Sequence, residues 1–172
     1  MIVRHYQVLI NYPITFYHVK TDVEFNSSYL IDQIEKNINE KLSFNTNVKG
    51  SMTDWNLFLK DSYFPNILKN IIEKHNIKLK TKLRFESAWG IKMEPGQETI
   101  LHSHDESVFS GILYLNDCNN KIIFPQIETE ILIEKNTFLI FSGVLDHFTT
   151  KVSGENTKYA IAFNSKQVKV WE

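Results

Sequence analysis

The chain has 172 residues, the size of one domain, and 42% of them are hydrophobic, which is too many for a disordered protein. Its 19 Lys and Arg residues nearly balance 20 Asp and Glu residues, and this argues against a nucleic-acid partner, which usually requires a basic excess. No apolar run approaches the roughly 20 residues of a membrane span, so no membrane partner is expected either.

The first half of the chain predicts helices with edge strands before them. Apolar segments at 8–10 and 14–19 are typical of edge strands, and in 27–42 and 62–75 apolar residues recur every three or four positions, as on one face of a helix. The segment 45–55 between these helices is interpreted as a loop or a lid. Arg4 interrupts the apolar N-terminus, so these residues do not resemble a signal peptide.

The second half predicts short strands. Seven segments rich in Ile, Phe, Tyr and Thr are separated by turn residues, and this spacing is typical of a jelly roll. They are 82–93, 110–116, 121–124, 129–135, 137–141, 147–152 and 158–164. We therefore expect a mainly β protein with flanking helices: a double-stranded β-helix (jelly roll) buttressed by N-terminal helices. We expect a single domain over 1–172, in which 1–80 provide helical and edge-strand support and 81–166 form the catalytic core.

Three histidines of the β half suggest a metal site. His102 and His104 are two positions apart, so on a strand both side chains point to the same face. His147 follows an apolar run and can meet them from another strand. Neutral imidazole is a good ligand for iron, copper, nickel and zinc, and the pattern predicts an open metal site at the mouth of a small barrel. The single cysteine, Cys118, excludes an internal disulfide and indicates a reducing, cytoplasmic setting.

At these residues the sequence resembles the Fe(II)- and 2-oxoglutarate-dependent oxygenases. The segments 89–117, 138–148 and 158–164 carry the resemblance, and the prolyl 4-hydroxylase-like branch, with its small bacterial and phage members, is the most similar. The segment 46–55 also resembles the region upstream of the core in those small members. The resemblance implies a dioxygenase that hydroxylates an unactivated C–H bond, with Fe(II), 2-oxoglutarate and O2, and with ascorbate as an optional reductant. For a phage protein, the cytoplasm would be that of the host.

The resemblance also implies roles for individual residues. His102, His104 and His147 would form the catalytic metal site, while Tyr114 and Lys158 would bind the far carboxylate of 2-oxoglutarate. Ser110 lies on the strand of Tyr114 and faces the same way, so it could add a hydrogen bond to the same ligand.

One position departs from the family pattern, because His104 stands where a carboxylate ligand is expected. Three arrangements remain open: a site of three histidines, a shifted motif in which Glu106 replaces His102, or a bulge that brings Asp105 to the metal. The alternation of a strand permits the first two and disfavours the third. We favour three histidines.

The substrate is expected to be a protein or peptide, with a prolyl residue as the first candidate, or else a small molecule. The aromatic residues Trp55, Phe58, Tyr63 and Phe64 are expected in the core or, alternatively, along a peptide groove. A cupin-type metal enzyme that does not use 2-oxoglutarate is the main alternative, although Lys151 stands where a cupin has asparagine. A non-catalytic jelly-roll binding module is the third possibility.

Overall fold

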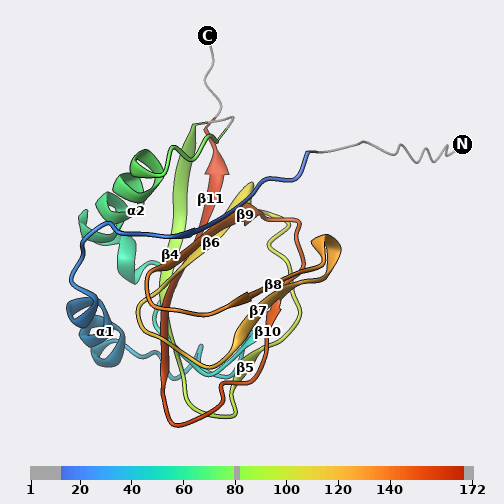
Figure 1. Ribbon diagram of the computed structural model, residues 1–172. Helices are drawn as coiled ribbons and strands as arrows, with labels where there is room; N and C mark the ends of the chain where they lie inside the picture. Colours follow the sequence, from blue (N-terminus) through green and yellow to red (C-terminus); the bar gives the residue numbers. More distant parts are fainter. Residues whose placement is uncertain (1–12, 80–81, 169–172) are drawn as a thin grey trace, which may run out of the picture.

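The structure is a computed structural model that describes residues 13–79 and 82–168. Its largest element is a six-stranded antiparallel sheet, in which strands distant in sequence are neighbours (Figure 1). The order across this sheet is β1 (Phe16–Lys20), β9 (Thr137–Ser142), β6 (Phe109–Tyr114), β11 (Lys158–Gln167), β4 (Leu83–Met93) and β3 (Ser51–Met52). β1 and β3 come from the first 80 residues, yet they extend the sheet formed by the later strands.

Shorter strands face the large sheet from the other side of the sandwich. β10 (Phe148–Thr149), β7 (Lys121–Phe124) and β8 (Thr129–Leu132) form one antiparallel sheet, and β2 (Val48–Lys49) pairs with β5 (Glu98–Thr99). The chain also forms two short 3-10 helices, η1 (Leu57–Leu59) and η2 (Pro125–Ile127). This arrangement confirms the predicted mainly β jelly roll.

Two helices cover the outer face of the large sheet, as predicted (Figure 1). α2 (Tyr63–Lys74) agrees closely with the expected helix, but α1 (Ser27–Lys36) is six residues shorter than predicted at its C-terminus. Asn37 ends α1, and Ile38 instead forms an isolated antiparallel bridge with Thr53. Ile38 packs against the core although it lies beyond the helix, and this is why the apolar period of the sequence is longer than α1.

The N-terminal strand predictions are partly confirmed. β1 forms within the expected segment 14–19 and pairs with β9, whereas the expected strand at 8–10 lies outside the described residues. The segment 45–55 is not wholly a loop, because it contributes both β2 and β3. No helix in the described part of the chain is long and apolar enough to cross a membrane.

Side chains of β11 point alternately into two layers of the core. Ala160 and Ala162 pack between the two sheets, while Ile161 and Phe163 pack against the helices. Because side chains alternate along a strand, Lys158 falls on the same side as the two alanines and points into the sandwich. The small alanine side chains next to it leave space in the interior.

Candidate metal centre

The two strand segments that carry His102 and His147 are held together by their backbones. The N–H of His102 donates to the carbonyl of His147 at 3.1 Å, and the N–H of His147 donates to the carbonyl of His102 at 2.9 Å. Directly paired residues of antiparallel strands project their side chains to the same face. The two imidazole centroids consequently lie 4.2 Å apart.

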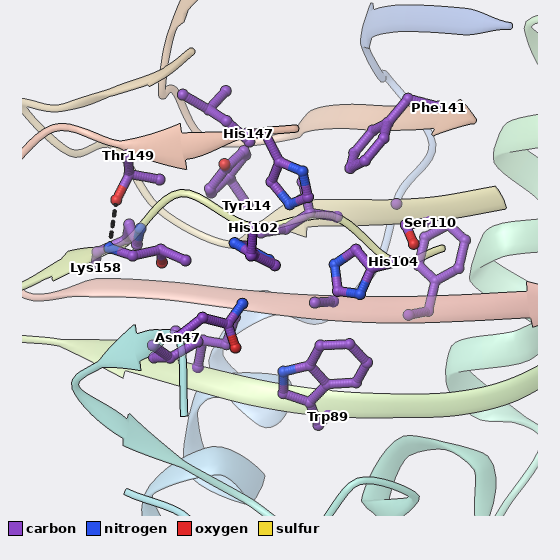
Figure 2. Close-up of a pocket in the computed structure, with 18 residues that line it drawn as sticks. Asn47, Trp89, His102, His104, Ser110, Tyr114, Phe141, His147, Thr149 and Lys158 are labelled. Carbon is purple, nitrogen blue, oxygen red and sulfur yellow. Dashed lines mark hydrogen bonds between the residues drawn. The ribbon is translucent and has the colours of Figure 1, made fainter. Parts of the chain in front are cut away.

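His104 joins this pair from the loop that follows β5. Its N–H donates to the carbonyl of Gly143 at 2.8 Å, which ties the loop to the turn before His147. The ring of His104 lies 4.9 Å from that of His102 and 5.3 Å from that of His147, centroid to centroid. One nitrogen from each ring lies within 4.8 Å of the others, so the three rings converge on a common space (Figure 2).

Backbone carbonyls orient two of the three rings for metal binding. Nδ1 of His102 lies 2.8 Å from the carbonyl oxygen of Ile100, and Nδ1 of His147 lies 3.0 Å from that of Leu145. A carbonyl can only accept, so each Nδ1 carries the proton and each Nε2 keeps a free lone pair. Ligand histidines are commonly fixed in this way by a hydrogen bond from the other ring nitrogen.

Burial keeps the three histidines neutral. The pKa of His147 falls to about 3 and that of His104 to about 4, mainly because the rings are removed from water and in smaller part because of the neighbouring imidazoles. Burial also lowers the pKa of His102. Because a metal ion competes with protons for imidazole nitrogen, a neutral set of three fits a transition metal such as Fe(II).

The alternative carboxylate ligands lie outside this group. Asp105 and Glu106 are both exposed, and the Asp105 carboxylate accepts a hydrogen bond from the Ser103 hydroxyl at 2.6 Å. The ligand cluster found among the described residues contains His102 but neither acidic residue. The geometry thus favours three histidines over the shifted motif.

A buried cavity extends from the histidines to Lys158 and Tyr114 (Figure 2). Lys158 is only 1% exposed, and its Nζ lies 5.9 Å from the centroid of the Tyr114 ring. Within residues 13–79 and 82–168, no carboxylate forms an ion pair with this ammonium, and the Tyr114 hydroxyl has no hydrogen-bond partner. Burial lowers the pKa of Lys158 to about 8 and raises that of Tyr114. A buried ammonium and an unsatisfied hydroxyl in one cavity favour an anionic ligand.

Ser110 also lines this cavity, from the strand of Tyr114. Its hydroxyl donates to Oδ1 of Asn164 on the neighbouring strand at 2.6 Å. A ligand in the cavity could therefore use only the lone pairs of Ser110.

Several lining residues were not predicted from the sequence. Among them are Asn47, Trp89, Phe141 and Thr149, whose positions Figure 2 shows around the histidines and Lys158. Trp89 and Phe141 lie in apolar strands, where the sequence indicates only core packing. Asn47 comes from the segment before β2, within the stretch 45–55 that is interpreted from the sequence as a loop or a lid, but no pattern in the sequence singles out this residue.

Gly143 allows the two histidine-bearing segments to approach each other. A Cβ atom at this position would lie 2.2 Å from the carbonyl oxygen of Ser107 and 2.6 Å from that of His104. Both contacts are with backbone, so the side chain could be accommodated only if one segment moved.

We expect Gly143→Ala to lower the free energy of unfolding by about 1–3 kcal/mol and to weaken metal binding, because it separates the turn before His147 from the loop of His104. Urea unfolding and Ni(II) titration measure the two effects. Gly96→Ala is the control: a Cβ there meets no atom within 4 Å, although its φ of +87° strains the backbone. Weaker metal binding in the Gly96 variant alone would contradict this role of Gly143.

No protein-family model matches the chain, and no curated protein matches it in sequence. Solved structures match its fold with high similarity. A viral collagen prolyl hydroxylase from Paramecium bursaria Chlorella virus-1, in complex with 2-oxoglutarate, superposes with a TM-score of 0.69 at 18% identity, over 89% of this chain and 96% of its own. The chain has the fold of the Fe(II)- and 2-oxoglutarate-dependent oxygenases.

Two further structures with this fold are less similar in sequence. HygX from Streptomyces hygroscopicus, with nickel, 2-oxoglutarate and hygromycin B bound, has a TM-score of 0.68 at 10% identity, over 88% of this chain and 82% of its own. SnoN, an α-ketoglutarate-dependent epimerase from nogalamycin biosynthesis, has a TM-score of 0.63 at 9% identity, over 88% and 77% of the two chains. The oxygenase fold thus accommodates several reactions, and the residues of each site determine the chemistry.

Proposed function

We propose that this protein is an Fe(II)- and 2-oxoglutarate-dependent dioxygenase that hydroxylates an unactivated C–H bond. One observation carries the proposal: a single cavity contains three converging neutral histidines and, deeper inside, a buried lysine without a carboxylate partner beside an unsatisfied tyrosine hydroxyl. The first group suits a metal ion, and the second suits the carboxylate of a co-substrate. A cupin-type enzyme without 2-oxoglutarate would have no evident use for the second group.

The proposed reaction converts 2-oxoglutarate, O2 and a substrate C–H bond into succinate, CO2 and a C–OH group. One oxygen atom enters succinate and the other enters the new hydroxyl, so the atoms balance. Fe(II) bound to the three histidines would supply the redox chemistry, and ascorbate is an expected additive that preserves the reduced metal. The protein's own part is to bind, to orient and to exclude water.

The protein residues would divide these tasks. His102, His104 and His147 would hold the metal on one side and leave its remaining positions open. Lys158 would form a charge-assisted hydrogen bond with the far carboxylate of 2-oxoglutarate, and Tyr114 would donate a second hydrogen bond to the same group. Ser110, whose proton is directed to Asn164, could only accept a hydrogen bond.

The proposed substrate is a prolyl residue of a protein or peptide. The sequence resemblance to the prolyl 4-hydroxylase-like branch and the fold similarity to the viral collagen prolyl hydroxylase support this choice. A small molecule is the alternative, since HygX has the same fold and was solved with hygromycin B. A cytoplasmic location without nucleic-acid or membrane partners remains an expectation from the sequence.

The proposal predicts succinate formation when the protein is incubated with Fe(II), ascorbate, 2-oxoglutarate and proline-rich peptides. Mass spectrometry should show peptides that have gained one oxygen atom at proline. Succinate without an oxidised peptide would retain the oxygenase and reject the prolyl substrate. Absence of succinate from protein with bound iron would reject the oxygenase itself.

A further inference from the structure

A second hollow, which we call the outer cleft, adjoins the cavity at the histidines and is not lined by Lys158 or Tyr114. It has a volume of about 370 Å³ and shares His102 and His104 with the inner cavity. Its other lining residues include Asn47, Met52, Trp55, Trp89, Ser103 and Asn164. A molecule in the outer cleft would therefore lie against the proposed metal site, where a substrate must be placed.

The outer cleft offers hydrogen bonds but no charge. None of the described residues that line it is Asp, Glu, Lys or Arg. Asn47 and Asn164 contribute side-chain amides, and Oδ1 of Asn164 is already occupied by the Ser110 hydroxyl, so its NH2 group remains for other partners. A cationic group entering this cleft would lose water without gaining a counter-ion, because no carboxylate lines it.

Trp89 provides a buried donor at the boundary between the cleft and the cavity. Its side chain is only 4% exposed, and within residues 13–79 and 82–168 its Nε1–H has no acceptor. Figure 2 shows this nitrogen directed toward the space between Asn47 and the histidines. A buried donor without a partner is unfavourable, and a ligand that supplies an acceptor would remove this cost.

Trp55 supports the ring of Trp89 and forms the outer wall. The two indoles pack edge to face, with centroids 4.8 Å apart and planes at 71°. Trp55 is 39% exposed, so it presents an aromatic surface to whatever enters the outer cleft. The two tryptophans therefore differ in role: one holds an unsatisfied donor inside, and the other offers apolar contact at the entrance.

We propose that the outer cleft binds an uncharged, carbonyl-bearing segment of the substrate, and that the Trp89 Nε1–H donates a hydrogen bond to this carbonyl. An internal stretch of polypeptide main chain fits this chemistry, because its amides complement those of Asn47 and Asn164 and it carries no terminal charges. A free amino acid or a polycationic sugar does not fit. The inference rests on the proposed function only in taking the histidines as the reaction centre.

NMR of the tryptophan indole groups tests this inference without turnover. The full-length protein, labelled with 15N at its indoles and loaded with Zn(II) and 2-oxoglutarate, is titrated with a mixture of capped tripeptides, with hygromycin B, or with the corresponding free amino acids. Trp89→Phe and Trp55→Phe assign the signals. We expect the Trp89 indole proton to move downfield with capped tripeptides and to stay unchanged with free amino acids or hygromycin B.

The Trp89→Phe variant also isolates the hydrogen bond, because it keeps an aromatic ring and removes the donor. At saturating 2-oxoglutarate, Trp89→Phe should raise the apparent midpoint of the tripeptide titration about three- to tenfold, the effect of one lost hydrogen bond. The inference would be overturned if the chemical shift of the Trp89 indole proton did not change with tripeptides, or if it changed with free amino acids or hygromycin B. The proposed function fails separately, if the zinc-loaded protein does not bind 2-oxoglutarate.

Discussion

Replacing His147 with alanine should abolish transition-metal binding. His147 is one of only three converging ligands among the described residues, and its ring is already oriented by the Leu145 carbonyl. Loss of a partner that merely orients a ligand weakens metal binding about 10- to 100-fold, so loss of the ligand itself should cost more than about 100-fold. Titration of the metal-free protein with Ni(II) or anaerobic Fe(II) measures this change.

A matched control distinguishes loss of a ligand from loss of any histidine. His18 lies on β1 with an exposed side chain, so His18→Ala should leave metal affinity unchanged. Circular dichroism confirms that each variant is folded. If His147→Ala bound metal within about threefold of the unmodified protein, the three-histidine site would be wrong. Loss of binding in Glu106→Gln together with retention in His102→Ala would instead establish the shifted motif.

Replacing Lys158 with methionine should weaken 2-oxoglutarate binding by about a hundredfold or more. The substitution keeps an unbranched side chain one atom shorter but removes the charge that would pair with the far carboxylate, an interaction worth a few kcal/mol in a buried site. Metal affinity should stay unchanged, because Lys158 is not a ligand. Lys151→Met removes an exposed lysine and is the control. Equal 2-oxoglutarate affinity in both variants would exclude Lys158 from the co-substrate site.

The same substitution should stabilise the protein when 2-oxoglutarate is absent, and the gain should depend on pH. The pKa of Lys158 is about 8 in the folded protein against 10.5 when unperturbed, so between these values the unfolded chain binds more protons and stability rises with pH. Below about pH 8 the buried ammonium costs the fold about 3 kcal/mol. Lys158→Met should therefore be most stabilising near neutral pH, and its advantage should disappear near pH 10.5.

Urea unfolding of both proteins across this pH range measures the difference between their free energies of unfolding. Contributions from titrating groups that both proteins share cancel in this difference. A difference independent of pH would indicate that the ammonium is paired or hydrated in the folded protein. A 2-oxoglutarate concentration just sufficient to saturate the unmodified protein should stabilise that protein more than the methionine variant, which binds the anion about a hundredfold more weakly.

Much of the fold could be predicted because strand periodicity is a local property of the sequence. Alternation of small and large apolar residues in 158–164 already directs Lys158 to one face, and β11 has that alternation in the structure. The extent of α1 could not be predicted in the same way. Ile38 continues the apolar period, but the residue is buried by pairing with Thr53 across a distance in sequence that no local pattern reveals.

In the candidate site, too, local spacing could be predicted from the sequence, whereas contacts between distant residues could not. The spacing of His102 and His104 predicts a shared face, but their convergence with His147 depends on a backbone bridge and on the absence of a Cβ at Gly143. Trp89 has the appearance of a core residue, and only the structure shows its donor unsatisfied beside the histidines. Of the aromatic residues expected in the core or a groove, Phe58 and Phe64 are buried in the core layer between helices and sheet, and Tyr63 packs against that layer partly buried. Trp55 instead lines the outer cleft.

The most direct test of the central claim is an anaerobic titration of the protein with Fe(II) and then 2-oxoglutarate, followed by visible absorption. Coordination of the keto-acid to protein-bound Fe(II) gives a metal-to-ligand charge-transfer band. We expect this band to appear with the unmodified protein and to be absent from His147→Ala, and Lys158→Met should require about a hundredfold more 2-oxoglutarate to produce it. Iron that binds tightly without any band at saturating 2-oxoglutarate would contradict the assignment of this protein as a 2-oxoglutarate-dependent enzyme.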